Sequence, residues 1–300
     1  MRVLMVGLGS IGRKHVRALR QCAPGAQVWA LRSSAESVPM EGVQDIYSLE
    51  GRSFDFAIVS NPTSCHAETV RELLRLRIPL FIEKPLFGEL GHEDLLEEIR
   101  RAQILTYVAC NLRFMDTLQF LKEYIKGLRI NEVNVYCGSY LPQWRPGTDW
   151  RNCYSARPEL GGGVHLDLIH ELDYVYWFFG KPERSSRVLR SRSSLSIPTA
   201  DYANYCLEYP DFCVSVVLNY FRRDYRRTVE IVAENGTFTA NLEKGTVSDA
   251  SGNLLFTSSQ EDFEIYCAQM GYFLSLLQKN ASRSSNDVFE AYEVLKLCLE

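Results

Sequence analysis

A glycine-rich turn close to the N-terminus restricts the fold more than any other feature. An apolar run at residues 2–6 leads into Gly7-Leu8-Gly9-Ser10-Ile11-Gly12, and a helical pattern continues to about Arg20. In a strand, turn and helix of this kind, the glycines permit a tight turn, close approach of the backbone to a pyrophosphate, and close helix–strand contact. The helix N-terminus favours negative charge. The motif predicts a dinucleotide site that includes Gly7, Gly9, Ser10, Ile11 and Gly12.

The end of the second predicted strand, residues 27–31, indicates which dinucleotide binds. Enzymes that prefer NAD usually carry Asp or Glu here, where the carboxylate binds the ribose 2′-hydroxyl. This chain reads Arg32-Ser33-Ser34 instead. A guanidinium and neighbouring hydroxyls suit a 2′-phosphate. We therefore expect NADP, bound by Arg32 and Ser33, with NAD as the alternative cofactor and a merely exposed Arg32 as the alternative interpretation.

Strand-like and helical segments alternate up to about residue 115. Strands are expected at residues 54–60, 79–82 and 105–110, with helices between them. This alternation predicts a parallel sheet, which binds ligands beyond the carboxyl ends of its strands. Polar side chains collect at those ends, namely Asn61, His66, Glu83, Lys84, Asn111 and Arg113. We expect residues 1–115 to form a dinucleotide-binding Rossmann domain.

Residues 116–300 predict a second domain for substrate binding and oligomerisation. After a helix at about 117–126, strand-like runs follow one another near 133–140, 187–190, 202–209, 212–221 and 228–233, and two helices close the chain. Consecutive strands predict an open, mainly antiparallel sheet. The loop at 142–160 is rich in Trp, Arg and Tyr, so Trp150 and Tyr154 are candidate substrate residues. A packed surface loop is the alternative.

The second domain also contains Gly161-Gly162-Gly163, which opens onto a predicted helix. Asp167, His170 and Tyr174 follow at steps of three and four, so their side chains share one face of that helix. An acid and an imidazole beside a bare backbone are what proton transfer needs. The alternative is a surface face with a chance histidine. His165 lies about 140° around the helix from His170 and is expected to pack elsewhere.

Composition excludes several functional classes. The net charge of −4 gives no support for nucleic-acid or anionic-membrane binding. The nine cysteines include no C-x-x-C pair, so we expect no metal site and a reducing, cytoplasmic environment. The N-terminal run leads straight into glycines and is interpreted as a strand, not a signal peptide.

Taken in order, these motifs resemble the glucose–fructose oxidoreductase / inositol dehydrogenase (Gfo/Idh/MocA) family of NAD(P)-dependent oxidoreductases. The resemblance rests on the glycine turn with His15, Asn61-Pro62 with His66, Glu83-Lys84-Pro85, Asn111 with Arg113, and the stretch from Gly161 to Asp173. It implies a Rossmann domain followed by an α/β domain on an open antiparallel sheet.

The resemblance also implies site residues. Lys84 matches the catalytic lysine of the family and His170 its catalytic histidine. Asn61, Pro62, His66 and Glu83 match positions near the cofactor, and Lys84 is assigned to cofactor binding as well. Asn111 and Arg113 line the approach to substrate, and His170 is also assigned to substrate binding. Many members place an aspartate four residues before the histidine, where this chain has Leu166; Asp167, one residue later, is assigned to catalysis and substrate binding with less weight.

The resulting hypothesis is hydride transfer between nicotinamide and a hydroxyl or ketone of a sugar, sugar derivative or cyclitol. His170 would exchange the hydroxyl proton and Lys84 would polarise that oxygen, the two meeting from different domains. The alternatives are a redox-neutral reaction with tightly held NAD, and a nucleotide-binding regulator without turnover. The run at 212–218 is apolar on both faces except for Ser215, so we expect a homodimer or homotetramer formed through the sheet.

Overall fold

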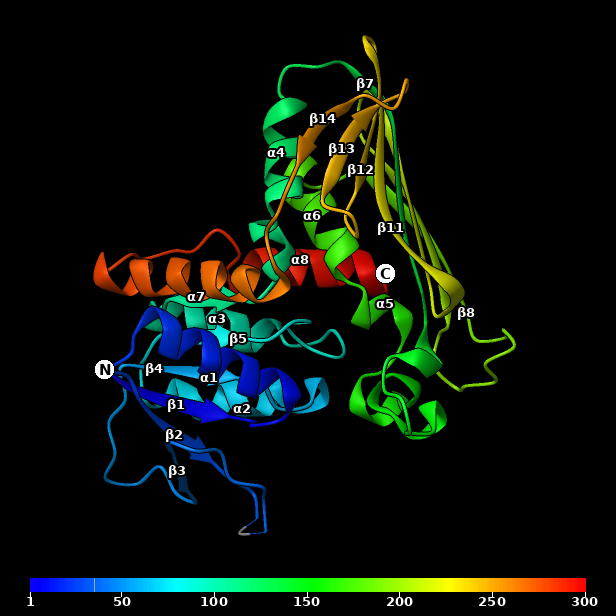
Figure 1. Ribbon diagram of the computed structural model, residues 1–300. Coiled ribbons are helices and arrows are strands. Elements are labelled where there is room, and N and C mark those ends of the chain that lie inside the picture. Colours follow the sequence, from blue (N-terminus) through cyan, green and yellow to red (C-terminus); the bar gives the residue numbers. More distant parts are fainter. Residues whose placement is uncertain (35) are drawn as a thin grey trace. The chain divides into compact units, whose positions relative to one another are not determined.

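The computed structural model describes residues 1–34 and 36–300, which form two units (Figure 1). Unit 1 comprises Met1–Asn111 and Asp262–Leu295, and unit 2 comprises Leu112–Glu261 and Lys296–Glu300. The chain therefore changes unit close to the expected position near residue 115. It differs from the sequence expectation at the other end, because most of the last two helices belong to unit 1.

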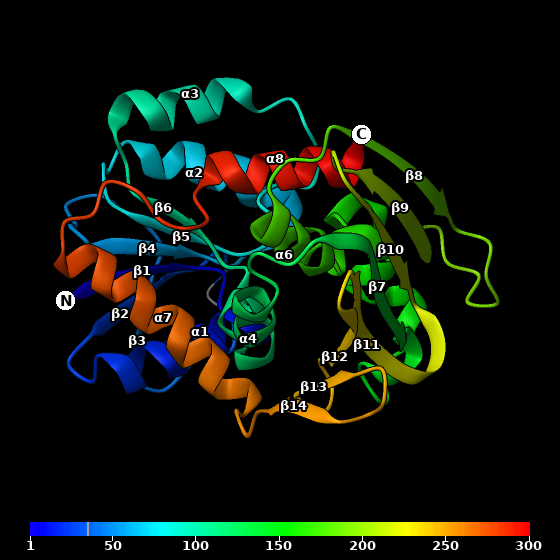
Figure 2. The same ribbon diagram turned by 90° about the horizontal axis from the view of Figure 1, so that it is seen from above.

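Unit 1 is built on a parallel sheet of six strands in the order β3-β2-β1-β4-β5-β6. Its central strands are apolar and buried, as expected of a sheet covered on both faces. Figure 2 shows α1 and α7 on one face and α2 and α3 on the other. The bounds are β1 Arg2–Val6, α1 Ser10–Cys22, β2 Gln27–Leu31, β3 Val43–Ile46, β4 Phe56–Val59, α2 His66–Leu74, β5 Leu80–Ile82, α3 Glu93–Ala102 and β6 Thr106–Val108.

The last two helices complete the core of unit 1. In α7 (Asp262–Gln278), Phe273 packs edge-on against Phe56 and Phe81 of the sheet, at ring-centroid distances of 5.2 and 5.4 Å. In α8 (Val288–Leu299), the Tyr292 hydroxyl donates to Glu93 and accepts from the Gly91 amide. The apolar faces of these helices thus return to the first sheet, which explains the difference from the expected boundary.

Unit 2 carries an eight-stranded sheet in the order β14-β13-β12-β11-β7-β10-β9-β8. Neighbouring strands are antiparallel except for β7 and β10, which confirms the predicted mainly antiparallel sheet. Figures 1 and 2 show α4, α5 and α6 along one of its faces. The bounds are α4 Asp116–Tyr124, β7 Ile130–Tyr140, α5 Val164–Asp167, α6 His170–Phe179, β8 Arg184–Arg190, β9 Tyr202–Glu208, β10 Cys213–Asn219, β11 Phe221–Ala233, β12 Gly236–Asn241, β13 Thr246–Asp249 and β14 Leu254–Thr257.

The two faces of β10 differ in burial. Val214, Val216 and Leu218 are fully buried, whereas Ser215 and Val217 on the opposite face are only half-buried. Helices therefore cover one face of this strand and leave the apolar Val217 on the other. Among the helices formed by residues 1–34 and 36–300, none has the length and apolarity needed to cross a membrane.

Candidate cofactor and active site

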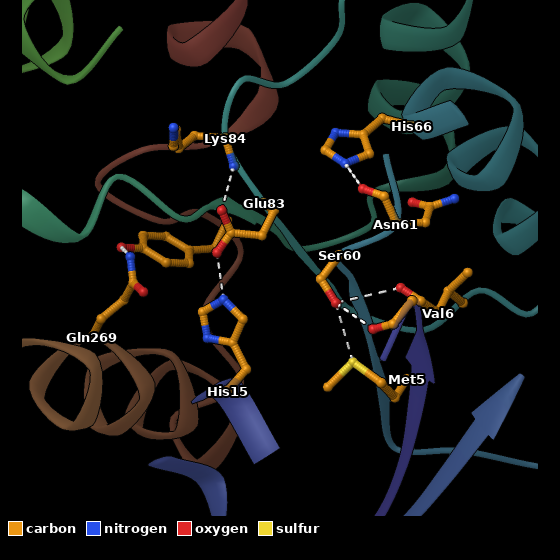
Figure 3. A network of polar contacts seen from close by, with 11 residues as sticks. Met5, Val6, His15, Ser60, Asn61, His66, Glu83, Lys84 and Gln269 are labelled. Carbon is orange, nitrogen blue, oxygen red and sulfur yellow. Dashed lines mark hydrogen bonds and ion pairs between the residues drawn. The ribbon is translucent and has the colours of Figure 1, made fainter. Parts of the chain in front are cut away.

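The glycine turn between β1 and α1 is held by close backbone contacts. Gly7 has a φ of +91°, and a Cβ there would lie 2.3 Å from the amide nitrogen of Asn61. A Cβ on Gly12 would lie 2.4 Å from the Gly7 carbonyl oxygen. The Ser60 hydroxyl donates to that same carbonyl at 2.7 Å (Figure 3). Only glycine fits at either position without a shift of the neighbouring backbone.

Gly9 is different, because no atom lies within 4 Å of a Cβ built on it. It precedes α1, which has no side-chain cap and no acidic residue in its first turn. The N–H groups at this helix end are thus open to an anion. These features fit the pyrophosphate of a dinucleotide, which would approach the backbone at Gly9 and the helix at Ser10.

A cavity of about 1350 Å³ opens beside this turn, at the carboxyl ends of β1, β2 and β4. This is more than the roughly 300–1,000 Å³ of a usual small-molecule pocket, so the cavity has room for a ligand as large as a dinucleotide. Of the predicted cofactor residues, those in its lining are Gly7, Gly9, Ser10, Arg32, Ser33, Asn61 and Pro62. Sequence reasoning missed others, including Arg13 and Tyr47. The position of Arg13 directly after the third glycine was the available signal.

The cavity wall beyond β2 is formed around Arg32. Its Nη2 donates to the Val38 carbonyl at 2.8 Å, and its Nε lies 3.3 Å from Oδ1 of Asp45 on β3. The Arg13 guanidinium donates to the same Val38 carbonyl at 2.9 Å. Two guanidinium groups therefore converge at this wall, and one carboxylate partly balances their charge.

His66 lies beneath the cofactor loop. It is 1% exposed, and its ring nitrogens lie 3.1 Å from the carbonyl oxygens of Pro85, Leu86 and Asn61. Burial lowers the pKa of this imidazole. His66 is absent from the described cavity lining, so its geometry indicates a residue that holds the loop after β4 to the segment after β5.

Glu83 and Lys84 follow β5, at the same edge of the sheet as the glycine turn (Figure 3). Oε2 of Glu83 accepts a hydrogen bond from the Lys84 amide at 3.1 Å, and Oε1 contacts Nε2 of His15 on α1. Lys84 itself is half-buried, as is Asn111 after β6. A lysine at this edge is placed where a doubly wound sheet presents residues to ligands.

In unit 2, the glycine run precedes two short helices and not the single helix that the sequence predicts. Helix α5 ends at Asp167, and α6 begins at His170. Gly161 and Gly163 have φ values of +86° and +132°, and a Cβ on Gly162 would lie 2.3 Å from the Tyr154 carbonyl oxygen. The break after α5 means that Asp167 and His170 are not related by a regular helical step.

Asp167 lies with the predicted substrate residues of the 142–160 loop. Its Oδ2 accepts a hydrogen bond from the fully buried Tyr220 hydroxyl. Asp167, Trp150 and Tyr154 line one cavity of about 150 Å³ with Trp144 and Arg145. Sequence reasoning missed Tyr220, which directly follows β10. The structure therefore joins three of the predicted substrate residues, while His170 is not among the residues described as lining this cavity.

Two other predicted residues are buried within unit 2. Tyr174 is fully buried and lies four residues after His170 in α6, so these two share one face of the helix, whereas the break after α5 separates Asp167 from them. Burial, followed by the nearby Glu171, raises the pKa of Tyr174 well above its usual value. Arg113 is 3% exposed and donates to both carboxylate oxygens of Asp173, at 2.9 and 2.7 Å. This buried pair anchors α6, and a contact of Arg113 with substrate stays a prediction.

The parallel sheet with its open glycine turn defines a dinucleotide-binding Rossmann domain. Residues 1–108 match the oxidoreductase family with an NAD-binding Rossmann fold, and residues 118–239 match the GFO/IDH/MocA C-terminal domain. The chain belongs to the Gfo/Idh/MocA family.

The chain is similar to two inositol dehydrogenases. It is 25% identical to myo-inositol 2-dehydrogenase from Thermotoga maritima over 82% of this chain and 77% of that protein. It is 23% identical to the NAD(+)-dependent scyllo-inositol 2-dehydrogenase from Bacillus subtilis over 96% of this chain and 89% of that protein. The fold resembles the WlbA dehydrogenase from Bordetella pertussis in complex with NADH and UDP-GlcNAcA, with a TM-score of 0.81, 18% identity, and coverage of 100% and 93%.

Proposed function

We propose that this protein transfers hydride between a nicotinamide cofactor and a secondary hydroxyl, or the corresponding ketone, of a cyclitol, sugar or sugar derivative. The observation that carries the proposal is Lys84, which follows β5 at the edge where the glycine turn forms the cofactor cavity. Similarity to inositol dehydrogenases over most of the chain supports the substrate class. The bound cofactor would supply the hydride acceptor or donor.

The residues of the protein itself bind the substrate, orient it and exchange its proton in this proposal. We assign polarisation of the reacting oxygen to Lys84 and exchange of its proton to His170, because an ammonium stabilises developing negative charge and an imidazole titrates near neutral pH. Asp167, Trp150 and Tyr154 are assigned to substrate binding, supported by their shared cavity. Asp167 also supports the proton transfer in this proposal.

The preferred cofactor in this proposal is NADP(H). Arg32 and Ser33 line the cavity at the end of β2, where the 2′-phosphate of NADP would lie. No carboxylate occupies the end of β2 itself, and Arg13 adds a second guanidinium. Asp45 opposes this preference, since its carboxylate competes for Arg32.

We also propose a cytoplasmic homodimer or homotetramer that forms through the outer face of the unit 2 sheet. Val217 and Tyr136 are register neighbours on β10 and β7, and both are half-buried on the face opposite the helices. The nine cysteines, all free thiols here, suit a reducing compartment. Light scattering at micromolar concentration tests the assembly. A wild-type protein that is monomeric, with a mass that Val217→Glu does not change, would contradict it.

A substrate screen tests the activity directly. Purified protein is incubated with NADP⁺ or NAD⁺ and a panel of cyclitols, hexoses and nucleotide sugars, and the absorbance of reduced nicotinamide is followed. We expect turnover with at least one cyclitol or sugar, lowered about 10²–10⁴-fold in Lys84→Met. Cofactor binding without turnover across the panel, in either direction, would contradict the proposal and favour a regulator.

A further inference from the structure

We propose that His15 is a positioning residue that fixes Lys84 in place through the carboxylate of Glu83. This inference rests on the proposed catalytic role of Lys84. Its structural basis is one chain of contacts within unit 1, which runs from α1 to the segment after β5 (Figure 3).

The centre of the chain is the Glu83 carboxylate, which uses its two oxygens on different partners. Oε1 contacts Nε2 of His15, and Oε2 accepts from the Lys84 amide at 3.1 Å. Glu83 is only 7% exposed, so little water competes for either oxygen. Hydrogen bonds to an ionised, buried carboxylate are stronger than neutral ones. The Glu83 side chain therefore holds the Lys84 backbone, and His15 in turn holds Glu83.

His15 is immobilised by its surroundings. It is fully buried, and its ring meets Phe81 and Tyr266 edge-on, at centroid distances of 4.9 and 5.8 Å. Among the described residues, Nδ1 has no hydrogen-bond partner. A neutral ring with its proton on Nε2 satisfies this geometry, because it leaves only a lone pair on Nδ1. In this tautomer Nε2 of His15 donates to Glu83.

Helix α1 carries both the expected pyrophosphate site and His15, which contacts Glu83 beside Lys84. Helix α1 begins at Ser10, where the pyrophosphate would lie, and His15 is five residues further along it. Loss of the His15 contact leaves the glycine turn unchanged but frees Glu83 to move with the Lys84 backbone. A displacement of about 1 Å at a catalytic group can slow chemistry roughly a hundredfold. We therefore expect loss of rate with retained cofactor affinity.

Two conservative variants separate positioning from packing. The amide nitrogen of Gln can occupy the place of Nε2, whereas that of Asn lies near Nδ1 and cannot reach Glu83. His15→Asn should slow single-turnover hydride transfer roughly tenfold to a hundredfold, and His15→Gln should recover most of the rate. Both should bind NADP nearly as wild type. Met270→Ala, in the core formed by α7, serves as a control for general destabilisation.

A second measurement needs neither substrate nor cofactor. Hydrogen exchange of the Lys84 amide is followed by NMR in the cofactor-free protein. We expect faster exchange in His15→Asn than in His15→Gln or Met270→Ala. If His15→Asn does not fold, Glu83→Gln and Glu83→Ala replace the pair. The Lys84 amide should exchange more slowly in Glu83→Gln, which keeps an acceptor for it, than in Glu83→Ala.

The outcomes distinguish the two proposals. Wild-type rates in Lys84→Met would end the proposed role of Lys84, whatever His15 does. A slow Lys84→Met together with equal rates and equal amide exchange in His15→Asn and His15→Gln would overturn the positioning role and leave the proposed function standing.

Discussion

Asp45 places Oδ1 of its carboxylate 3.3 Å from Nε of Arg32, across the pairing of β3 with β2. The side chain of Arg32 is only 7% exposed, so this contact is shielded from solvent. The residue that favours a 2′-phosphate and a residue that opposes it are thus direct neighbours. If NADP binds as proposed, this pair is expected to set the balance between NADP and NAD.

Substitutions at the pair should move cofactor preference in opposite directions. Asp45→Asn removes the competing charge and should tighten NADP binding relative to NAD. Arg32→Ala should weaken NADP binding roughly tenfold to a hundredfold, as loss of a charge-assisted hydrogen bond does, with little effect on NAD. Fluorescence titration with both cofactors measures this. NAD binding that equals or exceeds NADP binding and does not respond to Arg32→Ala would refute the NADP preference.

The glycine turn offers a matched set of substitutions. Gly12→Ala should destabilise the fold by about 1–3 kcal/mol, because its Cβ would overlap the Gly7 carbonyl. Gly9→Ala should leave stability unchanged but weaken cofactor binding roughly tenfold or more, since its Cβ enters the space of the pyrophosphate. Gly25→Ala, equally open but absent from the described cavity lining, is the control. Urea unfolding and cofactor titration report the two effects, and equal cofactor affinity in Gly9→Ala and Gly25→Ala would exclude the pyrophosphate site.

The buried pair of Arg113 and Asp173 should matter for stability. Their side chains are 3% and 1% exposed, so removal of one partner leaves a buried charge. Asp173→Asn should lower the free energy of unfolding of unit 2 by about 3–5 kcal/mol. The double variant Arg113→Met/Asp173→Leu should recover part of that loss. Urea unfolding measures both effects. The account would be contradicted if the stability lost in the double variant equalled the sum of the losses in Arg113→Met and Asp173→Leu measured singly.

The stability of the protein should fall in mild acid because of His165. Burial, followed by the charge of Arg187, lowers the pKa of His165 from 6.5 to about 4. The unfolded chain therefore binds a proton between about pH 6.5 and 4 that the folded chain does not. This linkage should cost on the order of 3 kcal/mol across that range, with no further loss from this group below it. His66 shifts in the same direction.

The pH profile of unfolding tests this directly. Urea unfolding of the wild type and of His165→Gln is compared from neutral pH to about pH 4. The variant should show a smaller loss of stability on acidification. Parallel profiles would mean that His165 is not the group responsible.

The parts predicted from sequence are those that local geometry dictates. The glycine turn can be predicted from the sequence because Gly7 and Gly12 occupy positions where a side chain cannot fit. Strand β3 was not anticipated, since Val43-Gln44-Asp45-Ile46 is short, polar and at the sheet edge. Without β3, the contact of Asp45 with Arg32 could not be foreseen, because it depends on strand pairing.

The break between α5 and α6 was also invisible, because apolar residues continue at helical spacing through Leu168 and Leu172. Tyr220 contacts Asp167 across 53 residues of sequence, and α7 returns to the first sheet from the end of the chain. These are long-range contacts, on which periodicity carries no information. They explain why the cofactor loop was predicted in more detail than the surroundings of Asp167.

Single-turnover hydride transfer in Lys84→Met and His170→Ala tests the central claim most directly. Removal of a positioned general acid–base group lowers rates about 10²–10⁴-fold. With a substrate found in the screen, both variants should show losses of this size while binding NADP normally, and His165→Ala should lose much less. A wild-type rate of hydride transfer in either Lys84→Met or His170→Ala would remove that residue from the mechanism and contradict the account.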